Sequence, residues 1–221
     1  MRLVRVTFLA AAVLAAVPAL SLVVPSDAHA SVSIAVGFEA LVKDADAVGV
    51  VTPVEAKSVW EDGRIYTYTK VKVDQSVAGD VGTGSEGWVR TMGGVVGKIG
   101  QMVDGEPVLT VGKPSLLFLR SFKQGGTWQV SARAQGQFPV LIDDTTKIRK
   151  VIRSANVGVL YPPKIRPAAE PNGSSQTLDP RAVSEEWKPR LAGEVLHDRP
   201  LDDVTREIAT TWKKLHPPVS K

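Results

Sequence analysis

Apolar and polar side chains alternate most regularly between Arg64 and Val73. One set of alternate positions is mainly β-branched and the other is charged or tyrosine, namely Ile65, Thr67, Thr69, Val71 and Val73 against Arg64, Tyr66, Tyr68, Lys70 and Lys72. A period of two is typical of an antiparallel strand with one buried face. Because Glu61-Asp62-Gly63 has the composition of a tight turn, residues 51–60 and 64–73 are predicted to form a β-hairpin.

Shorter apolar stretches separated by glycine-rich turns predict further strands. We expect them at residues 47–54, 88–92, 107–111, 115–119, 127–134 and 137–142. The uninterrupted apolar run at residues 115–119 favours a strand buried on both faces. Pro53 should lie at an edge or a bulge, since proline donates no ladder hydrogen bond. Strands that recur about every ten residues predict a mainly β fold, a small antiparallel barrel or sandwich.

Helical spacing of apolar residues appears at both ends of this β-rich region. Phe38, Leu41, Val42 and Ala45 would share one face of a short N-terminal helix over residues 37–45. Asp143-Asp144 is predicted to cap a second helix over residues 145–154, with a basic exposed face. A third helix is expected over residues 201–215, because its apolar positions form a stripe, namely Leu201, Val204, Ile208, Trp212 and Leu215.

The composition changes after the predicted second helix. Residues 156–182 are rich in proline, glycine and serine, as expected of an extended linker. The domain organisation that follows is a β-barrel domain with flanking short helices over residues 31–155, the linker, and a helical C-terminal tail over residues 183–221. The apolar stripe of that tail could pack against the chain's own barrel or against a partner.

The first thirty residues have the pattern of a signal peptide. Arg2 and Arg5 form a basic start, and an apolar run over residues 6–24 is broken by Pro18. The small-x-small pattern at residues 28–30 predicts cleavage between Ala30 and Ser31. The alternative is a membrane anchor, because the apolar run is close to the length of about 17 to 20 residues that a span requires. The signal-peptide interpretation predicts an exported protein, either periplasmic or secreted.

Composition narrows the class of protein further. The chain has no cysteine, so it contains no disulfide, and export from a bacterium fits this better than secretion from a eukaryotic cell. The formal net charge is +4, and the basic residues are dispersed rather than gathered in a stripe. We therefore expect no nucleic-acid partner. No segment after residue 30 is long and apolar enough to predict a membrane span.

Several segments together resemble a known group of sequences. They are Ala45–Val48, Trp60–Val73, Gly79, the Gly93-Gly94 turn and Gly112–Arg120. In this combination they resemble a group of uncharacterised exported proteins of myxobacteria and their relatives, over residues 31–142. The strand pattern of that group is similar to the OB-type barrel of the netrin-like domains found in tissue inhibitors of metalloproteinases. The resemblance implies an OB-like barrel.

The same resemblance raises protease inhibition as a possible function. Those inhibitors begin with a cysteine whose amine and carbonyl chelate the zinc of the target, and disulfides hold that end in place. The expected N-terminus here is Ser31 in a chain without cysteine. A free serine amine could still approach a metal, so an inhibitor or accessory partner of an exported hydrolase, such as a metalloprotease, is the alternative hypothesis.

Candidate catalytic chemistry is sparse. Residues 31–196 contain neither histidine nor cysteine, which argues against a zinc site or a Ser-His-Asp triad and predicts no cofactor. Three carboxylate pairs occupy turn or cap positions, namely Glu61 with Asp62, Asp104 with Glu106, and Asp143 with Asp144. The glycine-rich residues 93–100 match no phosphate-loop spacing and predict a bulge or hairpin. A non-enzymatic protein is therefore expected, and a hydrolase using carboxylates is the least favoured hypothesis.

Aromatic and basic residues offer a candidate partner-binding site. Tyr66 and Tyr68 share the polar face of the predicted strand with Arg64, and Trp60 precedes the turn. Tyrosine, tryptophan and arginine often anchor interfaces, and OB-type barrels present such a face to ligands. The alternative is that the tail or linker covers this face, or that the tyrosines lie inside the barrel. The preferred hypothesis is an exported binding or structural module whose partner is another exported or envelope protein.

Overall fold

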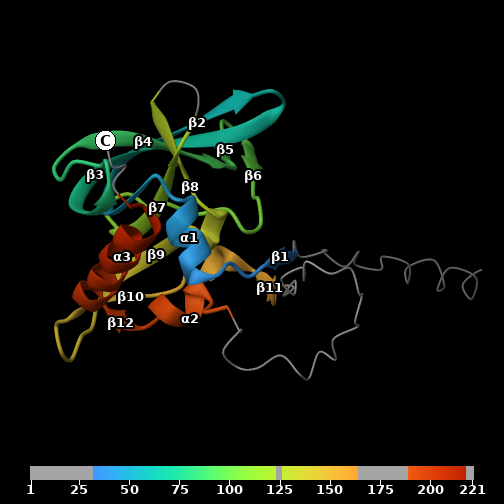
Figure 1. Cartoon of the computed structure of the whole chain (residues 1–221). Coiled ribbons are helices and arrows are strands. Elements are labelled where there is room, and N and C mark those ends of the chain that lie inside the picture. The colour runs from blue at the N-terminus through green and yellow to red at the C-terminus, as the bar shows by residue number, and fades with distance from the viewer. Residues whose placement is uncertain (1–31, 123–125, 164–188, 218–221) are drawn as a thin grey trace, which may run out of the picture. The chain divides into compact units, whose positions relative to one another are not determined.

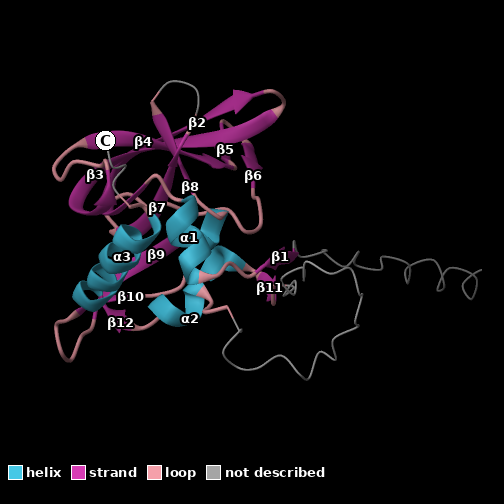
Figure 2. Ribbon diagram, in the orientation of Figure 1, coloured by secondary structure: helices cyan, strands magenta, loops and turns pink. Residues whose placement is uncertain are grey.

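The computed structural model describes residues 32–122, 126–163 and 189–217. Its first elements are β1 (Val32–Ile34), α1 (Phe38–Asp44), β2 (Ala47–Glu61), β3 (Arg64–Gly79), β4 (Glu86–Met92), β5 (Gly94–Val96), β6 (Ile99–Gln101) and β7 (Ser115–Ser121). The remaining elements are β8 (Thr127–Val130), η2 (Arg133–Gly136), β9 (Gln137–Ile142), β10 (Arg149–Val151), η3 (Ala155–Val157), β11 (Val159–Tyr161), α2 (Ala192–Leu196), β12 (Arg199–Pro200) and α3 (Leu201–Leu215). Figures 1 and 2 show the mainly β character of the molecule.

One large, mostly antiparallel sheet organises the chain. Its strand order is β12-β10-β9-β7-β2-β3-β4-β8. The β4–β8 pair is parallel, and β8 also pairs with β7 in an antiparallel register. Two small sheets accompany it, the parallel β1–β11 pair and the antiparallel β5–β6 pair. The sequence prediction of a mainly β fold is therefore confirmed.

Alternate side chains of the central strands enter two different hydrophobic clusters. The first cluster joins the sheet to the helices and includes Val48, Val50, Leu116, Phe118, Phe138, Phe38, Leu41, Val204 and Ile208. The second lies on the other face of the same strands and includes Ala47, Val51, Val71, Val89, Leu117 and Leu119. Because β2 and β7 contribute to both clusters, these two strands are buried on both faces. For β7 the uninterrupted apolar run predicted this burial correctly.

Helices α1 and α3 lie against each other and close the first cluster (Figure 1). Leu201, Val204 and Ile208 of the α3 stripe are buried there, and Trp212 and Leu215 pack against the edge of the cluster. Glu207 on the same helix accepts a hydrogen bond from Arg199 at 2.5 Å and pairs with Arg190. The apolar stripe of the tail therefore packs on the chain's own sheet.

The predicted hairpin is present and extends further than the sequence pattern indicated. Strands β2 and β3 pair from Ala47↔Gly79 to Glu61↔Arg64. Asp62 and Gly63 form the turn, both with positive φ, of 49° and 76°, as a two-residue turn of type I′ requires. The register shifts between Pro53 and Glu55, so the expected bulge at Pro53 is confirmed. The glycine-rich residues 93–100 also form a hairpin, β5–β6, as predicted.

The helix predicted over residues 145–154 is wrong. Asp143 caps a turn instead, accepting hydrogen bonds from the backbone N–H groups of Thr145 and Thr146 at 3.0 and 2.8 Å. These bonds, aided by the Lys150 ammonium group, lower the pKa of Asp143 to about 2. The chain then returns as β10, which pairs with β9 and β12. The same Asp side chain can cap a helix or a turn, and here the strand partners decide the outcome.

Two further boundaries differ from those expected. Residues 107–111 form no strand, and Gln137 holds this stretch by a side-chain amide that bonds both the N–H and the carbonyl of Val108. The expected linker begins later than residue 156, since η3 and β11 occupy residues 155–161 and β11 pairs with β1. Most of the segment assigned to the linker lies outside the described residues, as does the predicted cleavage site at Ala30 and Ser31.

The packing of α3 can be tested by an Ile208→Ala substitution. Ile208 is fully buried in the first cluster, so the cavity should lower the free energy of unfolding by about 2 to 5 kcal/mol. Lys214→Ala, at an exposed position of the same helix, should change it by less than about 0.5 kcal/mol. Urea unfolding followed by circular dichroism measures both values. Equal stability of the two variants would contradict the docking of α3.

Candidate functional site

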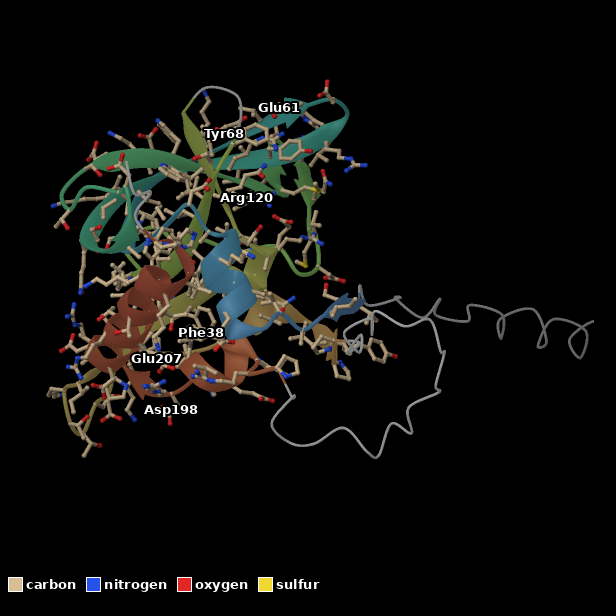
Figure 3. The ribbon with its side chains drawn as sticks, in the orientation of Figure 1. Phe38, Glu61, Tyr68, Arg120, Asp198 and Glu207 are labelled. Carbon is tan, nitrogen blue, oxygen red and sulfur yellow. The ribbon has the colours of Figure 1, made fainter. Side chains whose placement is uncertain are left out.

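The outer face of the β2–β3 hairpin brings together side chains from three strands. Tyr66 and Tyr68 lie on β3, and the register of β4 places Arg90 opposite Tyr68. Glu61 comes from the end of β2, next to the turn. Figure 3 shows Glu61 and Tyr68 on this hairpin, away from Phe38 and Glu207 among the helices.

These side chains form one connected group, which we call the Arg90 cluster: Glu61, Tyr66, Tyr68, Arg90 and Phe122. The Arg90 guanidinium donates to Glu61 Oε2 at 2.7 Å through Nη2 and to the Tyr68 hydroxyl at 3.2 Å through Nε. Tyr68 in turn donates to Glu61 Oε1 at 2.6 Å. The guanidinium carbon lies 3.4 Å from the centre of the Tyr66 ring and 4.9 Å from that of Phe122. Arg90 therefore holds a carboxylate and two aromatic rings at once.

The electrostatics of the cluster favour its charged form. The Tyr68 hydroxyl and then the Arg90 guanidinium donate to the Glu61 carboxylate and hold its pKa below the ordinary value of 4.5. Burial, followed by the hydrogen bond to Glu61, raises the pKa of Tyr68 above 10. Burial lowers the pKa of Arg90, but hydrogen bonds to Glu61 and the tyrosines outweigh it, so the net shift is upward. A change in the protonation of Glu61, Tyr68 or Arg90 therefore weakens the hydrogen bonds that join the three groups.

The residues predicted as the partner-binding site lie on two different faces of the hairpin. Tyr66 and Tyr68 are half-buried and Arg64 is exposed, and all three lie on the outer face. Trp60 is 49% exposed, but it pairs with Ile65 and so lies on the opposite face of the hairpin. Neither tyrosine ring lies on the strand face that carries the second hydrophobic cluster. Among the described residues, no helix covers the two rings.

Arg90 is the central residue that the sequence interpretation did not include. Its position in an alternating stretch indicated that it shares a face with Trp88 and Met92. That pattern does not indicate which strand lies beside it, because the register between β3 and β4 is set by residues far apart in sequence. Glu61 had been considered only as one of a carboxylate pair at a turn.

The opposite face of the hairpin is partly covered by β5 and β6. Gly94 lies so close to β2 and β3 that a Cβ there would approach Thr67 Oγ1 to 2.3 Å and Ser58 Oγ to 2.4 Å. Gln101 on β6 accepts the backbone N–H of Ile65 at 2.7 Å. Strands β5 and β6 therefore cover part of the face opposite the Arg90 cluster, while Trp60 on that face stays 49% exposed.

Two of the other carboxylates from the predicted pairs, Glu106 and Asp143, have structural partners. Glu106 accepts the backbone N–H of Met92 at 3.1 Å and pairs with Arg133 at 2.5 Å. Asp143 caps the turn described above. Over residues 32–122, 126–163 and 189–217, no three side chains of His, Asp or Glu gather in a geometry that could hold a metal ion.

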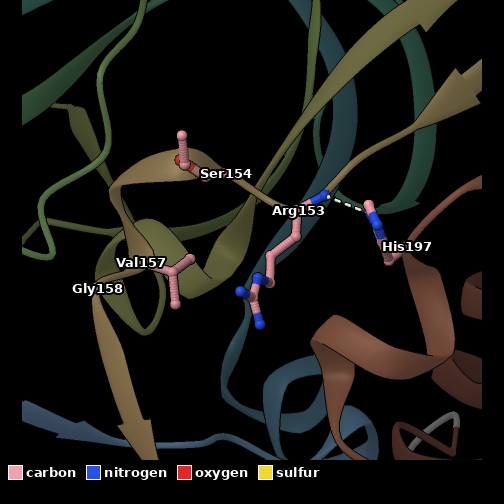
Figure 4. A pocket seen from close by; sticks show the side chains of 6 residues that line it. Arg153, Ser154, Val157, Gly158 and His197 are labelled. Carbon is pink, nitrogen blue, oxygen red and sulfur yellow. Dashed lines mark hydrogen bonds between the residues drawn. The ribbon is translucent and has the colours of Figure 1, made fainter.

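A separate pocket of about 460 Å³ lies between the β10–η3 segment and the C-terminal region. It is lined by Arg153, Ser154, Ala155, Val157, Gly158 and His197 (Figure 4). His197 is exposed, and its Nδ1 accepts the backbone N–H of Arg153 at 3.2 Å. The Ser154 hydroxyl is buried and donates to Gln137 Oε1 at 3.3 Å, so it is not the partner of His197.

The Arg90 cluster should make stability depend on pH in the acid range. The folded pKa of Glu61 is lowered, so the unfolded chain binds more protons. The stabilisation is then fully present above about pH 4.5 and is lost as the pH falls below that value. We expect Glu61→Gln and Tyr68→Phe each to reduce the loss of stability between neutral and acid pH, measured by urea unfolding. An unchanged pH dependence in both variants would contradict the role of the cluster.

Comparisons with known proteins identify no family and no function for the chain. No protein-family model, no curated protein and no solved structure matches the chain. No helix in the described ranges has the length and apolar character of a membrane span. The resemblance to exported myxobacterial proteins and to the netrin-like barrel therefore stays a prediction.

Proposed function

We propose that this chain is an exported, non-enzymatic binding module that contacts its partner through the Arg90 cluster and the adjacent Arg64. The single observation that carries the proposal is the fixed arrangement of the half-buried Tyr66 and Tyr68 around Arg90 on the hairpin face opposite β5 and β6. The partner we infer is another exported or envelope protein. Catalysis, a cofactor and nucleic-acid binding form no part of the proposed function.

Preorganisation is what suits the cluster to binding. A surface side chain normally loses rotamer freedom when a partner orders it, which costs about 0.5 to 1.5 kcal/mol. Here the bonds of Tyr68 to Glu61 and Arg90, and the stacking of Arg90 on Tyr66, already restrict both tyrosines. Half-buried tyrosines in a fixed orientation are typical anchors of protein interfaces.

The strand pairings support an OB-like barrel as the scaffold. The pairs β7–β2, β2–β3, β3–β4, β4–β8 and β8–β7 follow one another in a ring. The second hydrophobic cluster would fill the inside of this ring, since it draws on β2, β3, β4, β7 and β8. OB-type barrels bind ligands on a strand face, and the Arg90 cluster lies on the outer face of two of these strands.

Charge favours a protein partner over nucleic acid. Arg90 is neutralised by Glu61 at 2.7 Å, and Lys70 on the same face is neutralised by Glu86 at 2.5 Å. Lys57, opposite Tyr68, and Lys72 add positive charge to this face beside Arg64, and Glu55, opposite Lys70, adds negative charge. Phosphate backbones are bound by groups of Lys and Arg side chains, whereas Glu55, Glu61 and Glu86 lie among the cations of this face, and this mixed charge favours a protein partner.

One observation favours the alternative of an inhibitor of an exported hydrolase such as a metalloprotease. The segment after the proposed new N-terminus at Ser31 is held in place: β1 pairs with β11, and the Gln135 amide donates to the Ile34 carbonyl at 2.9 Å. Gln135 Oε1 also accepts the N–H of Val36 at 2.8 Å. Hydrogen bonds here would do what disulfides do in the netrin-like inhibitors.

The binding proposal predicts that Tyr66→Ala abolishes partner capture. The exported chain, tagged and incubated with the envelope and secreted fractions of its own cells, should retain a partner at least tenfold better than the Tyr66→Ala variant, because loss of an interface anchor costs about 2 kcal/mol or more. Tyr161→Ala is the matched control, since Tyr161 is 61% exposed on β11. Capture that survives Tyr66→Ala, or fails equally in the control, would refute this surface.

The inhibitor alternative predicts that the new N-terminus is essential. Protein that begins at Ser31, verified by mass spectrometry, should inhibit exported metalloprotease activity of the same cells, and one alanine added before Ser31 should reduce inhibition by about tenfold or more. Tyr66→Ala should leave inhibition unchanged. Equal inhibition by the extended and the native forms would exclude chelation by the N-terminal amine.

A further inference from the structure

We propose that the pocket between η3 and α2 binds a carboxylate with a short apolar body. This pocket is separate from the Arg90 cluster, and the inference does not depend on the function proposed for that cluster. Two stretches far apart in sequence form it, residues 153–158 and the segment around His197. Figure 4 shows the Arg153 side chain extending from the β10 side into the space between Val157 and the C-terminal segment.

Arg153 is the charged group of this site. In the described part of the chain, Arg64 and Arg153 are the arginines whose guanidinium groups have neither an ion pair nor a hydrogen bond. Its stem lies over α2, where a Cβ added to Gly193 would come within 3.1 Å of Arg153 Cδ. The side chain is therefore packed along its aliphatic part while its charged end is left without a partner.

His197 supplies a second, oriented donor. Its Nδ1 accepts the backbone N–H of Arg153 at 3.2 Å, so the neutral ring carries its hydrogen on Nε2. That tautomer leaves an N–H for a ligand in the pocket that His197 and Arg153 both line. Because the bond to Arg153 N fixes the ring, the donor is positioned before any ligand arrives.

The lining indicates the class of ligand. One guanidinium balances one negative charge, and its fork of N–H groups matches a carboxylate in a bidentate geometry. Ala155 and Val157 make the rest of the wall apolar, and the hydroxyl of Ser154 is already bound to Gln137. A phosphate dianion would leave one charge without a counter-charge against this apolar wall. The volume of about 460 Å³ suits a small organic acid or the C-terminal residue of a peptide.

Butyrate is a suitable probe, titrated into the isotopically labelled full-length chain and followed by NMR. We expect saturable shifts of the amides of Ala155 and Gly158, with a dissociation constant on the order of 1 mM. Arg153→Gln should weaken binding about tenfold or more and Arg153→Lys less, since lysine keeps the charge but not the fork. Arg206→Gln, an exposed position on α3, should bind as the native chain does. The melting temperatures of the native chain and of the three variants should be alike.

Neutral butyramide and inorganic phosphate complete the experiment. The assignment is overturned if butyrate produces no saturable shift, if butyramide or phosphate binds as tightly as butyrate, or if Arg153→Gln binds butyrate unchanged. Acetyl-dialanine with a free or an amidated C-terminus identifies the source of the carboxylate. Tighter binding of the free acid than of butyrate assigns the site to a peptide terminus, and weaker binding assigns it to a small organic acid.

Discussion

The fold depends on two strands that are buried on both faces. Because side chains alternate along a strand, β2 and β7 send one set into the helix-side cluster and the other set into the cluster on the opposite face. The helix-side set is Val48, Val50, Leu116 and Phe118, and the opposite set is Ala47, Val51, Leu117 and Leu119. A register slip of one residue would exchange the two sets. The pairing of Ala47–Val51 with Ser115–Leu119 is therefore fixed by both clusters at once.

This constraint ends at Val51, where the pairing with β7 stops. Beyond that point β2 and β3 continue to Glu61 and Arg64, and one face of the extension is partly covered by β5 and β6. The side chains of the Arg90 cluster on the other face belong to neither hydrophobic cluster. Arg90 there joins Glu61 of β2 to Tyr66 and Tyr68 of β3, and the rigid surface that results is what we propose a partner recognises.

Short sequence patterns predicted those strands and turns whose position depends on neighbouring residues alone. Alternation located β3, an uninterrupted apolar run located the buried β7, and the Asp62-Gly63 turn located the hairpin. The helix predicted after Asp143 is wrong because an aspartate cap and a basic face suit a helix and a turn equally. The pairing of β10 with β9, just before the turn, and with the distant β12 distinguishes them. Arg90 was missed for the same reason, since its neighbours are set by strand register. The pocket joins residues 153–158 to His197 and left no local signal.

The two candidate sites use arginine in opposite ways. Arg90 donates to Glu61 and Tyr68 and stacks on Tyr66, so its charge is compensated and its effect is to hold the rings still. Arg153 has a packed stem and an uncompensated end. A compensated arginine attracts no anion but gives a rigid surface that a protein can recognise. An uncompensated one in a pocket that a held imidazole also lines leaves a charge that a bound carboxylate would satisfy. The partners we propose, a protein surface for one site and a carboxylate group for the other, differ because the two arginines are paired differently.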